Sequence, residues 1–279
     1  MSKAIIETGT EDLLAFEESA VGVITLNRPQ ARNAMSTQMN LALARVLDEM
    51  DRRTSIRCIV LTGAGNAFCA GGDVKGMNAS GDSLGKQTDQ PTIDQLIRSQ
   101  RLNQRDTAGK IFTMPKPVIA SLPGAAAGAG CSLALAADLR IMSNDAFITT
   151  AFARVGLAGD YGGSFFLSHL VGAGKAKELY FFSERIDAPT CLALGIANRV
   201  VAADELMDTT MALAKQLANG PSIALGSMKE NINRAVMGAD VNTCLDLEAS
   251  HHVHSRLTED HRQAAKAFVL KTTPKFIGR

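Results

Sequence analysis

Two short segments rich in glycine and alanine are the part of this chain best suited to chemistry. Residues 66–73 read Asn-Ala-Phe-Cys-Ala-Gly-Gly-Asp, and residues 124–130 read Gly-Ala-Ala-Ala-Gly-Ala-Gly. Such small residues let the backbone approach a ligand closely. Two backbone N–H groups aimed at one point form an oxyanion hole, which stabilises a carbonyl oxygen as it gains negative charge. We therefore predict that the two segments meet at a catalytic site.

Asp160 is the strongest candidate for moving a proton at such a site. It lies in the apolar, glycine-rich run at residues 156–163. A carboxylate placed there is partly desolvated, which raises its pKa and makes it a better acid or base near neutral pH. The alternative interpretation is an N-cap for a helix that starts near Gly162. Asp73 has the same ambiguity, because it could cap a short helix that follows it.

Other kinds of site find less support in the residue pattern. The spacing of the glycines at 124–130 is not the G-x-G-x-x-G of dinucleotide-binding proteins. The five cysteines form no C-x-x-C pair, so we expect neither a disulfide framework nor a zinc site, and most should be small core residues. His251, His252 and His254 are clustered, but we interpret them as surface or interface histidines and expect no metal.

Composition and charge narrow the class of protein. With 46% hydrophobic residues, 20% charged residues and a formal net charge of +1, the chain is typical of a globular protein and lacks the charge of a nucleic-acid-binding protein. No run approaches the roughly 18 apolar residues of a membrane-spanning helix. The first residues do not resemble a signal peptide, so we expect a cytoplasmic location.

The hydrophobic pattern predicts alternating strands and helices up to about residue 200. Strands are expected at 21–26, 57–62, 118–122, 139–142 and 146–148, and helices at about 36–50, 93–112 and 129–137. Such alternation favours an α/β fold. From residue 203 the pattern is helical throughout. We therefore predict an α/β core at residues 1–202 that carries the site and a helical C-terminal region at residues 203–279.

Taken together, these motifs resemble the crotonase family, the enoyl-CoA hydratase/isomerase superfamily. The resemblance covers nearly the whole chain and rests on five segments in the family's order, at residues 26–34, 62–73, 124–138, 156–163 and 258–271. It implies a spiral of ββα units, an acyl-CoA thioester as ligand, no permanently bound cofactor beyond the coenzyme A of the substrate, and a homotrimer or a hexamer built through the C-terminal helices. The similarity is greatest to the branch that contains the isomerase of phenylacetate degradation.

The resemblance also implies roles for particular residues. The amides of the oxyanion hole map to Ala70 and Ala129, with Gly128 as the second choice for the latter. Coenzyme A is implied to contact Arg28, Ala31, Arg32, Asp73, Val74 and Lys75, and also Phe268 and Lys271 from a neighbouring subunit. The acyl pocket is expected from residues 76–112 with Tyr161, Phe165 and Phe166, although these aromatic residues could equally be packing residues.

Two departures from the family's pattern predict the type of reaction. Hydratases of the family hold and activate water with two glutamates, and the matching positions here are Ser132 and Phe152. Asp160 matches the aspartate of family members that move double bonds. We therefore predict an enoyl-CoA isomerase in which Asp160 is the single carboxylate base. An enoyl-CoA hydratase, an enzyme with Asp160 as nucleophile, a non-catalytic acyl-CoA-binding or RNA-interacting member, and a serine protease with Ser132 as nucleophile stay as alternatives.

Overall fold

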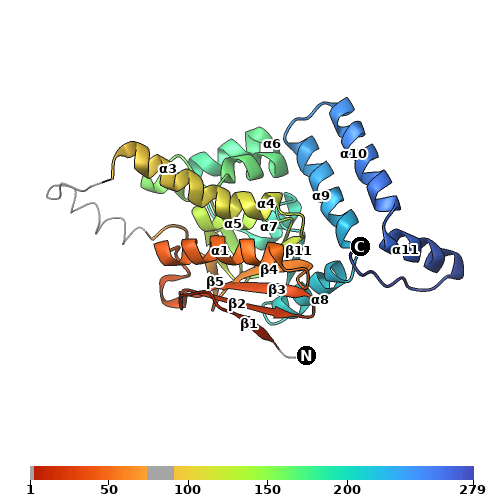
Figure 1. The fold of residues 1–279 in the computed structure, drawn as a ribbon. Helices are drawn as coiled ribbons and strands as arrows, with labels where there is room; N and C mark the ends of the chain where they lie inside the picture. The colour runs from red at the N-terminus through yellow and green to blue at the C-terminus, as the bar shows by residue number, and fades with distance from the viewer. Residues whose placement is uncertain (1–2, 74–90) are drawn as a thin grey trace.

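The computed structural model describes residues 3–73 and 91–279, which fold around two β-sheets covered by helices (Figure 1). The larger sheet has the strand order β1-β2-β3-β4-β6-β8-β11 and is antiparallel from β1 to β3 and parallel from β3 onward. Its strands are β1 (Ala4–Ile6), β2 (Leu13–Glu18), β3 (Val21–Leu26), β4 (Cys58–Gly63), β6 (Val118–Leu122), β8 (Leu139–Ser143) and β11 (Arg199–Val201).

A second, smaller sheet has the order β10-β9-β7-β5. Its strands are β5 (Ala67–Cys69), β7 (Ala125–Ala127), β9 (Phe147–Thr149) and β10 (Ile186–Asp187). The strand pairs β4–β5, β6–β7 and β8–β9 each place their first strand in the large sheet and their second in the small one. A helix follows each pair, so the chain repeats a ββα unit. This arrangement confirms the predicted spiral.

The central strands of the large sheet are buried on both faces. Every residue of β4 and of β6 is buried, which explains why both strands are continuous apolar runs rather than alternating ones. Helix α1 (Thr37–Arg52) covers one face with Met39, Leu43, Val46 and Met50, and Ser36 caps it by accepting a hydrogen bond from the Met39 amide, as predicted. Helix α8 (Leu206–Ala218) covers the other face through Leu206, Ala214 and Ala218.

The segment predicted as one helix at 93–112 is three pieces. Helix α3 (Ile93–Gln104) passes into a π-helical turn (Arg105–Gly109) and then into α4 (Lys110–Thr113). The remaining helices of the core are α5 (Ala129–Ala136), α6 (Gly163–Phe182) and α7 (Ala188–Ala193). Short 3-10 turns lie at Pro29–Ala31 and at Phe152–Val155. The π-helical turn matters because such turns are frequent at functional sites.

The C-terminal helices are α9 (Ser222–Val236), α10 (Val241–Arg256) and α11 (Glu259–Leu270), which extend away from the sheets (Figure 1). The predicted division after residue 202 falls before α8, yet α8 packs on the large sheet and is part of the core. The helical region that projects from the core therefore begins at α9. The boundary at residue 202 stays a prediction, because the pattern identifies a helix without saying which surface the helix covers.

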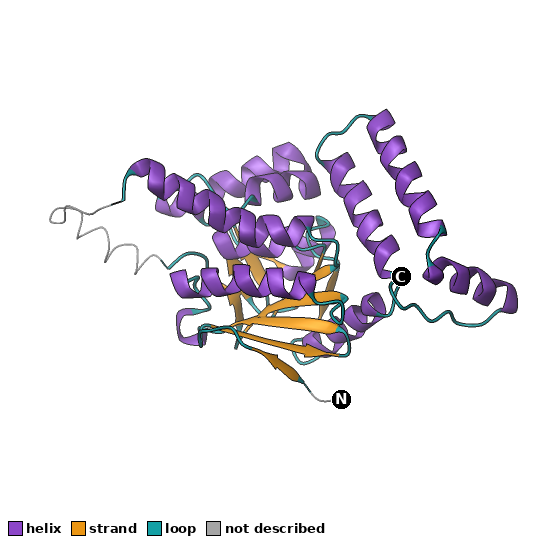
Figure 2. Cartoon of the chain, viewed as in Figure 1, coloured by secondary structure: helices purple, strands orange, loops and turns teal. Residues whose placement is uncertain are grey.

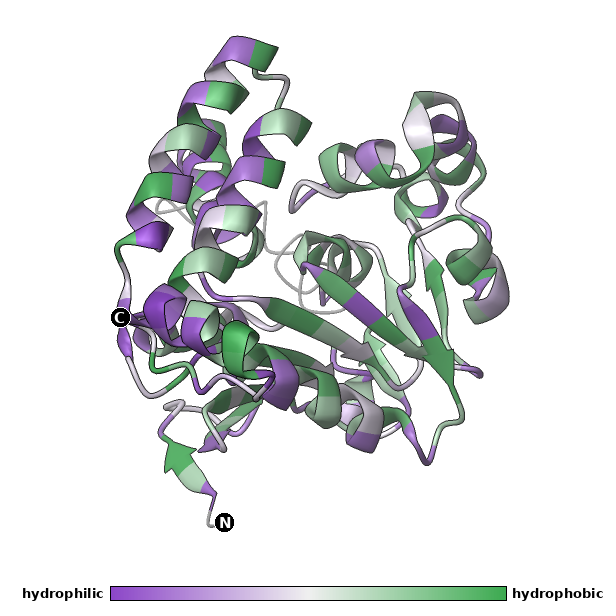
Figure 3. Ribbon diagram, turned by 90° about the vertical axis from the view of Figure 1, so that its right-hand side faces the viewer, coloured by the Kyte–Doolittle hydropathy of each residue, from purple (hydrophilic) through white to green (hydrophobic). Residues whose placement is uncertain are grey.

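The projecting helices expose many apolar side chains. Figure 2 shows α9, α10 and α11 standing clear of the strands, and in Figure 3 hydrophobic and hydrophilic residues alternate along the helices of this part. Exposed apolar residues on α9 and α10 include Met228, Ile232, Leu245 and Val253. The predicted trimer or hexamer stays a prediction.

No helix within residues 3–73 and 91–279 has the length and apolarity needed to cross a membrane.

Candidate active site

The two glycine- and alanine-rich segments meet as predicted. Strand β5 ends at Cys69 and pairs in parallel with β7, so the loops that follow the two strands emerge side by side. A Cβ atom on Gly124 would overlap the carbonyl oxygen of Asn66, and one on Gly130 would overlap the carbonyl oxygen of Cys69. Larger residues at these positions would push the segments apart. Glycine is therefore what allows the two loops to share one site.

Asn33 ties the first loop to the sheet. Its buried side chain accepts a hydrogen bond from the Arg28 amide at 2.9 Å and donates to the carbonyl oxygens of Ala64 at 2.9 Å and Ala67 at 2.8 Å. All three partners are backbone groups: Arg28 lies after β3, Ala64 lies just before β5, and Ala67 is the first residue of β5. The sequence analysis did not single out Asn33, because nothing near it in the sequence indicates these partners.

The amide of Ala70 is not available for an oxyanion hole, which corrects our prediction. The Ala70 N–H donates a hydrogen bond of 2.9 Å to the carbonyl oxygen of Arg32. The Gly72 N–H, two residues further on, donates to no acceptor within the part of the chain that the structure describes. Met35 pairs with this loop through its own amide, which donates to Gly71 O at 2.8 Å. Gly72 is therefore the better candidate for the first amide.

The second predicted amide, that of Ala129, donates to no acceptor among the residues that the structure describes. Ala129 is the first residue of α5, where a helix leaves its N–H groups without intrahelical acceptors and carries the positive end of its dipole. Gly128 was the second choice for this amide. Its N–H donates to Thr149 O at 3.1 Å, so it is not available as an oxyanion-hole donor. A Cβ atom on Gly71 would lie 3.4 Å from the Ala129 nitrogen. The loop that contains Gly72 thus lies against the start of α5.

Asp160 lies in the loop between the 3-10 turn at Phe152–Val155 and α6, and it does not cap that helix. The N-cap of α6 is Gly162, and no side chain caps it. The Asp160 Oδ1 atom is buried without a hydrogen-bond partner among the described residues. Desolvation raises the pKa of Asp160 to about 6. These features disfavour the N-cap interpretation and fit a carboxylate kept ready for proton transfer.

The charge of Asp160 reaches the first loop and helix α6. It raises the pKa of the Cys69 thiol at the end of β5, and it also raises the pKa of Tyr161 and of Tyr180, although burial is the larger cause in all three. The Tyr161 amide donates to Gln104 Oε1 at 2.5 Å, which ties the Asp160 loop to the start of the π-helical turn. The carboxylate therefore lies close to the first loop.

Ser132 and Phe152, the positions that match the hydratase glutamates, lie near Asp160 with Tyr180. Ser132 Oγ donates to Gly128 O at 3.3 Å, and a hydrogen bond with Ser132 favours ionisation of Tyr180 against the larger effect of burial. The ring of Phe152 stacks on that of Tyr180, with centroids 5.9 Å apart and planes 16° apart. Tyr180 could not be predicted from the sequence, because its place depends on how α6 folds back.

Cys69 and Cys131, the cysteines of the two loops, are poor nucleophiles in this setting. Both thiols are buried, and burial raises the pKa of each to about 12. A thiol in that state holds its proton at neutral pH. Ser132, which we considered as a protease nucleophile, has Tyr180 and Gly128 rather than a histidine as its hydrogen-bond neighbours.

The residues implied to contact coenzyme A are only partly placed. Arg28 and Asp73 form an ion pair with 3.1 Å between Nη1 and Oδ2, so their charges are directed at each other. Ala31 lies in the 3-10 turn at Pro29–Ala31, and Arg32 is exposed beside it. Val74 and Lys75 lie outside the described residues. The contacts to coenzyme A stay predictions.

Phe268 and Lys271 lie at the end of α11, at the opposite side of the molecule from α3 (Figure 1). Phe268 is 86% exposed. Within one chain these two residues do not join the other predicted coenzyme A contacts. Their predicted contact with coenzyme A from a neighbouring subunit stays a prediction.

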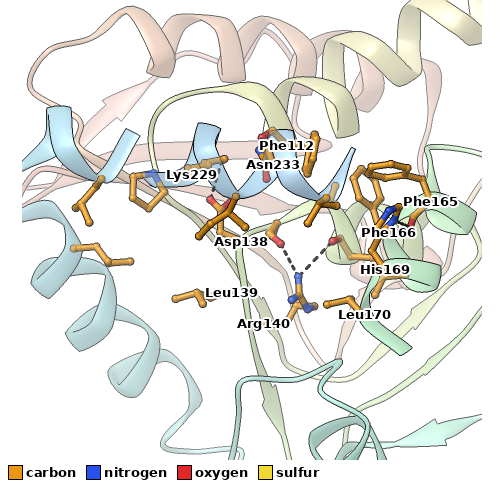
Figure 4. A pocket seen from close by; sticks show the side chains of 18 residues that line it. Phe112, Asp138, Leu139, Arg140, Phe165, Phe166, His169, Leu170, Lys229 and Asn233 are labelled. Carbon is orange, nitrogen blue, oxygen red and sulfur yellow. Dashed lines mark hydrogen bonds and ion pairs between the residues drawn. The ribbon is translucent and has the colours of Figure 1, made fainter. Parts of the chain in front are cut away.

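A cavity of about 420 Å³ between α6, α8 and α9 is separate from this site. Phe112, Phe165 and Phe166 form part of its wall, and its lining includes neither Asp160 nor Ala129. Figure 4 shows its charged side chains already engaged: Lys229 pairs with Asp138 at 2.8 Å, and Arg140 donates to backbone carbonyl oxygens. Phe165 and Phe166 therefore face this cavity, and their predicted acyl-pocket role finds no support here.

The histidines give no sign of a metal site. No group of three potential metal-ligating side chains occurs in residues 3–73 and 91–279. His251 instead lies 2.6 Å from Asn231 Oδ1, between α10 and α9.

Comparison with known proteins places this geometry in a family. The profile described as enoyl-CoA hydratase/isomerase matches residues 16–279. The chain is 35% identical to the 1,2-epoxyphenylacetyl-CoA isomerase of Escherichia coli (strain K12), covering 96% of this chain and 99% of the relative. It is 32% identical to the short-chain-enoyl-CoA hydratase of Clostridium acetobutylicum, covering 93% of this chain and 95% of the relative.

The fold agrees with solved structures of the same group. A crystal structure of an enoyl-CoA hydratase from Polaromonas sp. JS666 superposes with a TM-score of 0.86 at 32% identity, covering 95% of this chain and 99% of that one. The fold is thus a crotonase fold, a mixed α/β spiral with a helical C-terminal region. The chain belongs to the enoyl-CoA hydratase/isomerase family.

Proposed function

We propose that this protein is an enoyl-CoA isomerase that moves a double bond with Asp160 as its only carboxylate acid and base. The observation that carries the proposal is the state of Asp160. Its Oδ1 atom is buried with no hydrogen-bond partner in residues 3–73 and 91–279, and desolvation raises its pKa to about 6. A group with a pKa near the working pH can both take and return a proton.

The amides of Gly72 and Ala129 supply the oxyanion hole in this proposal. A thioester oxygen that accepts two hydrogen bonds makes the adjacent carbon more acidic, because the enolate charge resides on that oxygen. Removal of one such donor typically costs about 3 kcal/mol of transition-state stabilisation. The start of α5 adds the positive end of its dipole to the Ala129 amide.

The reaction then needs one base that acts at two carbon atoms of the substrate. With a 3-enoyl thioester, the Asp160 carboxylate removes a proton from C2, and the electron pair of that C–H bond forms a dienolate. The protonated Asp160 returns the proton to C4, and the double bond ends between C2 and C3. No second carboxylate is needed. Ser132 and Phe152, which lie beside Tyr180 near Asp160, offer none.

Hydration of a 2-enoyl thioester is the second candidate, because a relative with 32% identity is named a short-chain-enoyl-CoA hydratase. That reaction needs a held and activated water. Ser132 and Phe152 cannot act as the carboxylates for such a water, so isomerisation is the better supported outcome. The coenzyme A contacts at Arg28, Ala31, Arg32 and Asp73, and the cytoplasmic location, are part of the proposal.

The test is to incubate the purified protein separately with 3-enoyl-CoA and 2-enoyl-CoA in heavy water and to follow products and deuterium by mass spectrometry. We expect double-bond migration without water addition. Asp160→Asn should lower the rate at least about 100-fold, the size of a lost general base. Asp204→Asn, which changes an exposed aspartate before α8, is the matched control and should leave the rate unchanged.

Two results would overturn the proposal. Formation of 3-hydroxyacyl-CoA as the main product of the wild-type protein would show a hydratase. Full activity of Asp160→Asn on every substrate turned over would show that the proton moves through another group.

A further inference from the structure

Tyr180 reaches the active site because α6 folds back on itself. Gly172 interrupts this helix with φ 77° and ψ 157°, values far from helical, and the two halves meet at an angle there. A left-handed φ of this kind favours glycine. The fold-back returns Tyr180, near the end of α6, to the side of Gly163 at its start.

The Tyr180 hydroxyl lies between the two glycines that flank the Asp160 loop. A Cβ atom on Gly163 would lie 2.6 Å from Tyr180 Oη and would also overlap Ser132 Oγ. A Cβ atom on Gly159 would lie 3.2 Å from Tyr180 Cε1 and 3.7 Å from Oη. The tyrosine thus packs directly against the backbone on both sides of Asp160. No free volume separates it from these glycines.

The ring and hydroxyl of Tyr180 are held from two directions. The ring stacks on Phe152, which is itself 5% exposed. The hydroxyl pairs with Ser132, whose own hydroxyl donates to Gly128 O. The polar groups of this cluster therefore satisfy one another and offer little to a water molecule. Phe152, Ser132 and Tyr180 together form a packed wall beside Asp160.

Asp160 and Tyr180 are both half-buried. We propose that Tyr180 keeps water away from the side of Asp160 on which it packs, and thereby determines that this site moves a double bond rather than adding water across it. This inference rests on the proposed function for its consequence, although the exclusion of water can be tested without substrate. Tyr180 is a specificity-determining residue here, because it acts by filling space beside the base.

The chemistry shows why filled space decides the outcome. In hydration, the oxygen of water forms a bond to C3 of a 2-enoyl thioester while a base takes one of its protons. The pair of the C2–C3 double bond moves toward the carbonyl, and C2 then gains a proton. Asp160 could serve as that base if a water molecule lay beside it. Excluding water from an active site prevents such side reactions.

The first test needs no substrate. We would titrate Asp160 by NMR of its side-chain carboxyl carbon in the wild-type protein, in Tyr180→Ala and in Tyr180→Phe. Cys69, Tyr161 and Tyr180 are the titratable groups whose pKa values respond to Asp160. Water entering the space left by Tyr180→Ala should lower the Asp160 pKa toward the usual value of about 3.9. Tyr180→Phe keeps the ring and should leave the pKa near that of the wild-type protein.

The second test follows the products in water enriched in ¹⁸O. Tyr180→Ala should form ¹⁸O-labelled 3-hydroxyacyl-CoA from 2-enoyl-CoA at a rate at least about tenfold above that of the wild-type protein, because water then reaches the space that Tyr180 filled. The double variant with Asp160→Asn should lose this product. Tyr180→Phe should isomerise without hydrating.

The failure of this inference and the failure of the proposed function would give different results. A Tyr180→Ala protein that is folded, keeps the wild-type Asp160 pKa and forms no labelled product would overturn the role of Tyr180. A wild-type protein that moves no double bond would overturn the proposed function, and the NMR titration would still decide whether Tyr180 excludes water.

Discussion

The backbone N–H of Ala70 donates a 2.9 Å hydrogen bond to the carbonyl oxygen of Arg32. This bond joins the loop after β5 to the turn after β3, and it occupies a donor that the family pattern had suggested for the oxyanion hole. Among the described residues, the amides of Gly72 and Ala129 donate to no acceptor. The Ala70 amide therefore holds the loop in place, and the amides of Gly72 and Ala129 are the candidates for binding a substrate oxygen.

Ala129→Pro tests the oxyanion hole directly. Proline is well tolerated at the first position of a helix, where it removes an N–H that has no helical acceptor. We expect kcat to fall about 100- to 1000-fold, the usual cost of one lost oxyanion donor, with little loss of thermal stability. Ala129→Gly keeps the N–H and is the control. A proline variant with the activity of the glycine variant would exclude this amide from catalysis.

The raised pKa of Asp160 predicts a pH dependence of activity. A base must be deprotonated to act, so kcat/KM should rise as the pH passes through about 6 and level off above it. A pH–rate profile of the wild-type protein measures this. Activity that rises only well below pH 5 would mean that the carboxylate is not desolvated when it acts.

The same shift predicts how stability changes with pH. The pKa of Asp160 is higher in the folded state than in the unfolded state, so the folded protein binds the proton more tightly. The proton therefore stabilises the folded protein at low pH, and this stabilisation is lost as the pH rises through about 6. At pH 8, Asp160→Asn should therefore have a free energy of unfolding about 1–2 kcal/mol higher than that of the wild-type protein, after allowance for the partial exposure of Asp160. Denaturant unfolding measures this difference. The difference should shrink toward pH 4. Equal stability at both pH values would contradict the cost of burying the charge.

Asn33→Ala should weaken both the fold and the site. It removes three hydrogen bonds to backbone groups and leaves the Ala67 carbonyl oxygen buried without its partner. We expect a loss of about 2–4 kcal/mol in urea unfolding. Asn27→Ala is a matched control, because the Asn27 side chain donates to Glu11 O in an exposed hydrogen bond. This substitution should lower the free energy of unfolding by no more than about 0.5 kcal/mol. Similar losses for both variants would show that the Asn33 contacts add little.

Gly130→Ala tests the close approach of the two loops. The added Cβ would overlap the Cys69 carbonyl oxygen, and we expect a loss of about 1–3 kcal/mol together with a lower kcat, since the amides would move apart. Gly174→Ala is the contrasting control in α6, where nothing lies within 4 Å of the added atom. It should stabilise the protein by about 0.5–1 kcal/mol, because alanine favours the helix. A stabilising Gly130→Ala would mean that the loops have room to separate.

The sequence by itself was enough for the fold class and for the centre of the site. Apolar runs at residues 21–26, 58–63 and 118–122 become buried strands of the large sheet, because a strand covered on both faces must be apolar throughout. The small residues of the two segments indicated a backbone open to a ligand, and the structure adds that Gly124 and Gly130 let the two segments approach each other. Asp160 was recognised from its apolar, glycine-rich surroundings, and desolvation does raise its pKa to about 6, although its role in proton transfer stays a prediction.

Tertiary structure decided what depends on partners far away in the chain. Whether the Ala70 amide is free depends on where the Arg32 carbonyl lies, and no local pattern records that distance. Tyr180 joins Asp160 only because α6 turns back at Gly172, and α8 joins the core only because of the sheet face that it covers. A residue's type and its near neighbours determine what it is able to do. The packing of segments distant in sequence determines which of these abilities the protein uses.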